Sequence, residues 1–225
     1  MKFRHSLDDL GNDMHLLLKQ SKTAFKPHFP DTYLYKRVVA LARNDGFLSE
    51  DHIELVYVTL ISWGMNQRSA KLVSYEDFER SVRENEGDIR ILKDLKLELL
   101  SDVAFEEQLK VQGDLFRSMA ISDPNKPAFV SFSKAMHFML PDLIVPMDRK
   151  YTLSFFGGEG RVSTGGFDLY RDIFRKYWLY ATEHSELRNY LDTDWTLSVP
   201  KLLDNLVIGY RKLKERNAEV IPHPV

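Results

Sequence analysis

Apolar residues recur along most of the chain at the spacing of amphipathic helices. Leu7, Leu10, Met14, Leu17 and Leu18, for example, lie on one side of a helix. The same spacing, read with capping residues and with glycine and proline breaks, predicts helices over 6–22, 31–43, 49–64, 75–84, 89–100, 102–120, 129–140, 149–156, 167–182, 185–191 and 198–216. The pattern therefore predicts an all-α fold of about ten helices.

Residues 53–63 are rich in β-branched side chains and would also suit a buried strand. Ser49 at the expected N-cap, Gly64 at the end and the lack of other strand-like segments favour a helix. We expect one compact helical domain over 1–225, built as an orthogonal bundle. The segment 121–128 is the candidate boundary between two lobes, because its prolines cannot continue a helix.

The predicted helix 129–140 is apolar around most of its circumference, which indicates that it is buried at the centre of the fold. Ser133, Lys134 and His137 fall on one narrow arc of this helix. A lysine is costly to bury unless its amine reaches water, a partner or a cleft. Lys134 is therefore the first candidate for a functional residue.

Composition narrows the possible functions. The net charge of −2 and the pI near 6.4 provide no overall basic field for nucleic acid, so DNA binding would need a local patch. The most basic cluster consists of Arg211, Lys212, Lys214 and Arg216, at the end of the last predicted helix. The absence of cysteine excludes disulfides, zinc-thiolate sites and thiol nucleophiles, and it agrees with a reducing compartment.

No apolar run approaches the length of a membrane span, and the N-terminus lacks the apolar region of a signal peptide. We therefore expect a cytoplasmic protein without a membrane partner. The segment 155–166 is rich in glycine, but no Gly-Lys-Ser/Thr follows it, so a flexible loop is favoured over a phosphate-binding loop. No metal or cofactor is expected.

Lys134 and the segment Val145-Pro146-Met147-Asp148 resemble the helix-hairpin-helix superfamily of base-excision DNA glycosylases. The family motif places a lysine at a helix start and, about one helix later, Val-Pro-x-Asp. The resemblance covers a small part of the chain: no glycine-rich hairpin precedes Lys134, and the spacing from lysine to aspartate is shorter than in the family. It implies a two-lobed helical protein of DNA repair with its active site between the lobes.

By this resemblance, Lys134 is the amine that attacks the sugar and Asp148 assists it. The candidates for contact with the substrate are Trp63, Met65, His137, Arg149 and Tyr151. The basic cluster of Arg211, Lys212, Lys214 and Arg216 would contact the DNA backbone. Trp63 has an alternative role as an aromatic plug beneath a loop.

Two other interpretations remain open. In the first, Asp148 only caps the helix that follows it, and Lys134, His137 and Asp148 form a buried polar cluster in a non-catalytic helical binding or regulatory module. In the second, His137, Asp142 and Asp148 hold the metal of a hydrolase, although no pair at typical ligand spacing supports this. The exposure of Lys134 is the feature that best separates these interpretations.

Overall fold

The computed structural model describes residues 5–11, 13–24, 30–66, 71–126, 128–157 and 166–219. Within these residues the chain is helical and forms no β-sheet; an isolated antiparallel bridge joins Leu72 to Ser122. The predicted all-α fold is confirmed. Residues 53–62 lie within a helix and Trp63 caps its C-terminal end, so the strand alternative for this segment is wrong.

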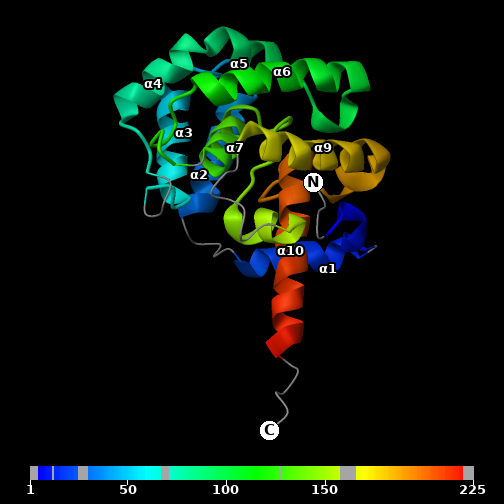
Figure 1. The fold of residues 1–225 in the computed structure, drawn as a ribbon. Coiled ribbons are helices and arrows are strands. Elements are labelled where there is room, and N and C mark those ends of the chain that lie inside the picture. Colours follow the sequence, from blue (N-terminus) through cyan, green and yellow to red (C-terminus); the bar gives the residue numbers. More distant parts are fainter. Residues whose placement is uncertain are drawn as a thin grey trace.

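The elements follow one another with short connections (Figure 1). The helices are α1 (Met14–Ser21), α2 (Pro30–Ala42), α3 (Glu50–Ser62), α4 (Tyr75–Glu84), α5 (Glu86–Leu92), α6 (Asp102–Ser118), α7 (Phe129–Met139), α8 (Ser154–Phe156), α9 (Phe167–Glu183) and α10 (Val199–Glu219). Short 3-10 turns lie at Leu7–Leu10, Lys22–Ala24, Leu97–Leu99 and Ser185–Tyr190, and a π-helical turn lies at Arg149–Leu153.

Serine caps determine where three of these helices begin. The hydroxyls of Ser49, Ser74 and Ser101 each accept a hydrogen bond from the backbone amide three residues later, at the starts of α3, α4 and α6. Each cap satisfies an amide that has no partner within its own helix. Local sequence is therefore sufficient to start these helices.

Two predicted helices were wrong in extent. The helix predicted over 6–22 is interrupted at Gly11, whose φ of 73° lies in the left-handed region, and only the α1 part is α-helical. The helix predicted over 89–100 begins earlier, at Glu86, and ends at Leu92. Beyond it the backbone amide of Leu97 donates to the carbonyl of Asp142 at 3.0 Å, so a tertiary hydrogen bond replaces the helical one.

Helix α7 occupies the centre of the molecule and packs against α2 and α3 (Figure 1). Phe132 and Met136 are 1% and 0% exposed, which confirms the prediction that this helix is buried. The buried apolar side chains form one connected cluster that includes residues on both sides of the segment 121–128. The lobe boundary near this segment stays a prediction.

Helix α10 begins inside the molecule, crosses α1, and projects beyond the other helices at its C-terminal end (Figure 1). Every residue from 201 to 209 is buried, so this part of the helix is surrounded by protein. Among the described residues, no helix has both the length and the apolar character needed to cross a membrane.

Candidate functional site

Ser133 joins α7 to the connector that carries Asp148. Its hydroxyl, which is buried, accepts from the backbone amide of Met147 at 3.1 Å, and it also lies 3.2 Å from the carbonyl of the same residue. This contact holds the end of the connector against α7 one residue before Asp148. Ser133 therefore places Asp148 next to the helix that carries Lys134.

Asp148 is half-buried and caps the π-helical turn Arg149–Leu153. Its carboxylate accepts from the amide of Tyr151 at 2.7 Å, and its own amide donates to the Thr152 hydroxyl at 3.1 Å. The predicted N-cap role is confirmed. Asp148 therefore holds the start of this turn in place.

Lys134 is also half-buried, and its Nζ lies 5.6 Å from the centre of the Trp63 ring. Trp63 is itself half-buried, and its indole nitrogen Nε1 is a buried donor with no hydrogen-bond partner among the described residues. An unsatisfied buried donor is uncommon in native proteins, which makes this indole N–H a candidate for contact with a ligand.

A fully buried ion pair within α10 lies near these residues. Lys201 and Asp204 are 0% and 5% exposed, and Lys201 Nζ donates to Asp204 Oδ2 at 2.6 Å. The Lys201 amine lies 4.5 Å from the centre of the Trp195 ring and 5.2 Å from that of Trp63. The two tryptophans surround the cation with the negative faces of their rings, which lowers the cost of burying it.

The electrostatics of Asp204 connect all four charged residues. Burial raises the pKa of its carboxyl, Lys201 and Lys134 oppose the rise, and Asp148 adds to it. Lys134, Asp148 and Lys201 therefore all act electrostatically on Asp204, and we call these four residues the central charge cluster. Its two half-exposed members are the residues predicted from the sequence to be catalytic.

The Trp195 ring is positioned by hydrogen bonds within the segment before α10. The carboxylate of Asp192 accepts from the backbone amides of Asp194, Trp195 and Thr196 at 2.7 to 2.9 Å. The Trp195 indole donates to Asn205 Oδ1 at 3.1 Å. Backbone and side chain are both held, so the Trp195 ring has a fixed position beside Lys201.

His137 lies in the core, 0% exposed, rather than at a surface where it would meet a substrate. Its Nδ1 is 2.6 Å from the carbonyl of Ile144 and its Nε2 is 3.1 Å from the Tyr35 hydroxyl. A carbonyl only accepts, so Nδ1 carries the proton and Nε2 accepts from Tyr35. We therefore assign His137 to packing. Met65, another predicted substrate contact, is also buried, at 4%.

The other predicted substrate contacts lie on the turn capped by Asp148. Arg149 is exposed and Tyr151 is half-buried, with Lys150 Nζ 5.0 Å from the centre of the Tyr151 ring. These two side chains share a short turn with Asp148, so the structure brings them close to the central charge cluster.

The predicted DNA-backbone residues lie on the projecting end of α10 (Figure 1). At 1.5 Å per residue, Arg211 and Arg216 are about 10 and about 18 Å along the helix axis from Asp204. Lys212 donates to Glu215 at 3.0 Å, and Lys214 Nζ lies 5.4 Å from the Tyr210 ring. Part of this charge is therefore neutralised within the helix.

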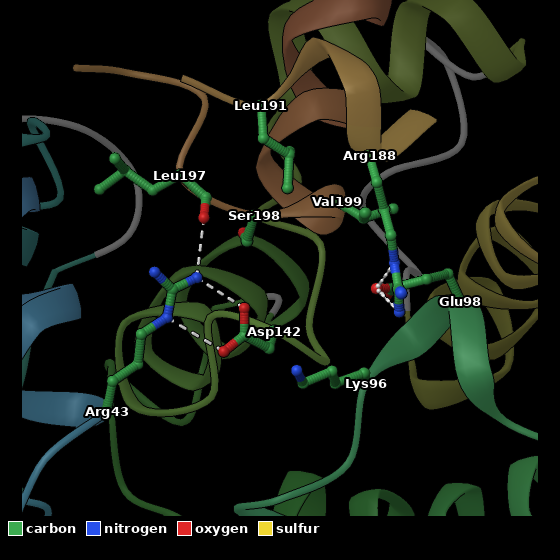
Figure 2. Close-up of a pocket in the computed structure, with 9 residues that line it drawn as sticks. All are labelled: Arg43, Lys96, Glu98, Asp142, Arg188, Leu191, Leu197, Ser198 and Val199. Carbon is green, nitrogen blue, oxygen red and sulfur yellow. Dashed lines mark hydrogen bonds and ion pairs between the residues drawn. The ribbon is translucent and has the colours of Figure 1, made fainter. Parts of the chain in front are cut away.

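A cavity of about 420 Å³ opens at the other end of α10, and neither Lys134 nor Asp148 lines it (Figure 2). Arg43 binds Asp142 there through two hydrogen bonds of 3.0 and 2.6 Å. The cavity and the central charge cluster are thus separate features. Most of the glycine-rich segment predicted as a loop, 158–165, lies outside the described residues.

The geometry does not assemble the metal site considered from the sequence. His137 uses both ring nitrogens within the protein, and Asp142 is paired with Arg43. In the part of the chain that the structure describes, no group of three or more histidine, aspartate or glutamate side chains is arranged to hold a metal ion.

Sequence reasoning missed Lys201 and Asp204. The sequence does indicate that this pair is buried, because apolar residues occupy every side of the helix around it: Leu202, Leu203, Leu206, Val207 and Ile208. A helix that is apolar all round is buried, and a lysine and an aspartate three positions apart within it can pair with each other.

Two buried histidines predict a loss of stability in mild acid. Burial lowers the pKa of His137 to about 3 and that of His52 to about 4, from an ordinary value of 6.5. The unfolded chain therefore binds more protons than the folded chain as the pH falls below 6.5. Between about pH 7.5 and about pH 5.5, each histidine should lower the free energy of unfolding by about 1.4 kcal/mol.

Urea unfolding at the two pH values checks this. His52→Gln should remove about half of the acid-induced loss, while His15→Gln, at an exposed position, should leave the loss unchanged. An equal loss in the parent and in His52→Gln would show that His52 does not contribute.

No protein-family model, curated protein or solved structure matches this chain. The assignment of a function therefore depends on the chain's own residues.

Proposed function

We propose that the protein is a DNA glycosylase that acts at the central charge cluster, with Lys134 as the nucleophile and Asp148 as the assisting carboxylate. The observation that carries this proposal is the pair of hydrogen bonds by which Ser133, the neighbour of Lys134, joins Met147, the neighbour of Asp148; both half-exposed residues also act electrostatically on the buried carboxyl of Asp204. Lys134 comes from α7 and Asp148 from the cap of the following turn, and Ser133 links the two elements.

In the proposed reaction Lys134 attacks the sugar, and Asp148 stabilises the positive charge that develops on it. The unprotonated Lys134 amine forms a bond to C1′ of the deoxyribose while the bond from C1′ to the base breaks, and the base leaves with the electron pair and takes up a proton. Positive charge develops on the sugar as the base departs. The Asp148 carboxylate, held by the Tyr151 amide, stabilises that charge.

The surroundings of Lys134 support a bound base. The Trp63 ring offers a surface for stacking beside the Lys134 amine, and its unsatisfied N–H would find an acceptor on the substrate. Arg149 and Tyr151, next to Asp148, are the residues we assign to the flanking nucleotide. The projecting Arg211, Lys212, Lys214 and Arg216 would contact phosphates farther along the duplex.

Borohydride trapping on duplex DNA that contains an abasic site tests the proposal. The Lys134 amine should condense with the C1′ aldehyde to a Schiff base, and reduction should give a permanent protein–DNA adduct. Lys134→Gln should abolish the adduct. Lys150→Gln, which removes a neighbouring exposed amine, should retain it. An adduct that forms equally with Lys134→Gln, or no adduct with the parent protein, would refute the proposal.

A second candidate is a non-catalytic helical binding or regulatory module, favoured by the cap that Asp148 makes with Tyr151. In that case the central charge cluster has only a structural role in the core. Lys134→Met would then form a protein at least as stable as the parent, because an apolar side chain of similar length needs no desolvation of charge. The two candidates therefore predict different results from variants at one position.

A further inference from the structure

The cavity at the start of α10 has the size of a small-molecule site. Its volume of about 420 Å³ lies in the range of ligand-binding pockets, roughly 300–1,000 Å³. Its walls come from segments far apart in the sequence: the end of α2, the connector after α7, the turn at Leu97–Leu99 and the residues before α10 (Figure 2).

The cavity carries three cations and two carboxylates, and both carboxylates are neutralised by arginine. Asp142 binds Arg43 through two hydrogen bonds, and Glu98 binds Arg188 at 2.9 and 3.1 Å. Each guanidinium is thereby fixed at the wall. The remaining cation, Lys96, makes no ion pair with any described carboxylate within 4 Å, and its amine lies between the two pairs in Figure 2.

The rest of the lining is suited to the organic part of a ligand. Leu191, Leu197 and Val199 provide an apolar wall beside the charged groups. Arg43 also holds this wall in place, because its Nη2 donates to the Leu197 carbonyl at 2.8 Å. The first turn of the 21-residue helix α10 lies at the same place, and Val199 at its start lines the cavity.

We propose that this cavity binds a small organic anion. Its carboxylate or phosphate group contacts Lys96, and its apolar part lies against Leu191, Leu197 and Val199. A cation would meet an excess of positive charge, and a wholly apolar ligand would gain nothing from Lys96. The proposal is independent of Lys134 and of any activity on DNA.

Isothermal titration calorimetry of the full chain tests it with three probes of similar shape: phenyl phosphate, benzoate and phenol. The parent should bind at least one of the two anions more tightly than phenol. Lys96→Gln should weaken anion binding by about tenfold or more, because a hydrogen bond to a charged group is lost. Lys96 is exposed, so the variant should fold normally.

Lys110→Gln is the matched control, since it removes an exposed lysine of α6 that does not line the cavity. It should leave the affinity for the anions unchanged. Three results would overturn the proposal: the anions and phenol bind equally, neither anion binds at millimolar concentration, or Lys96→Gln leaves the affinity for the anions unchanged. Adduct formation by Lys134 in the trapping experiment should be the same in Lys96→Gln as in the parent.

Discussion

Replacing Gly209 by alanine is expected to prevent α10 from packing against α1. A Cβ atom at this position would lie 1.9 Å from the carbonyl oxygen of Leu17 and 2.6 Å from its carbonyl carbon. Both atoms belong to the backbone of a helix, so no side-chain rotation can relieve the clash. Overpacking usually costs 1–3 kcal/mol, and we expect a loss above about 3 kcal/mol here, measured by urea or thermal unfolding.

Gly87→Ala is the control for this prediction. Gly87 lies within α5, and a Cβ built there meets nothing within 4 Å. Alanine favours the helix over glycine by about 0.4–1 kcal/mol, so this variant should equal or exceed the parent in stability. Similar unfolding midpoints for the two alanine variants would contradict the close approach of α10 to α1.

The second large effect is expected at Asp204. Asp204→Asn keeps the shape of the side chain but leaves the buried ammonium of Lys201 without its carboxylate partner. Breaking a buried pair in this way typically costs about 3–5 kcal/mol, because an uncompensated charge stays in the core. Urea unfolding at neutral pH measures the loss.

Removing both charges should restore most of that stability. In Lys201→Met/Asp204→Leu the rings of Trp63 and Trp195 meet an apolar side chain, and no charge needs to be desolvated. The double variant is therefore expected to be more stable than Asp204→Asn. A loss below about 1 kcal/mol in Asp204→Asn would show that water reaches Lys201.

The sequence alone determined the features that depend on near neighbours. Apolar spacing predicted the all-α class, and the cap at Ser49 decided that residues 53–62 are helical despite their β-branched side chains. The apolar circumference of 129–140 predicted the buried central helix, and the Pro-Met-Asp segment predicted the cap at Asp148. The caps depend on interactions between residues within about one helical turn. The fold class and the buried helix follow from the spacing and number of apolar residues, which indicate how much of each helix is buried.

The tertiary structure alone decided which charges meet. Lys134 of α7 acts electrostatically on Asp204 of α10, and Arg43 meets Asp142 across 99 positions of the sequence. The segment after α5 is also held by a long-range bond, from the amide of Leu97 to the carbonyl of Asp142. A local pattern cannot show these pairings, because they depend on how whole helices pack and on the burial that makes an unpaired charge costly.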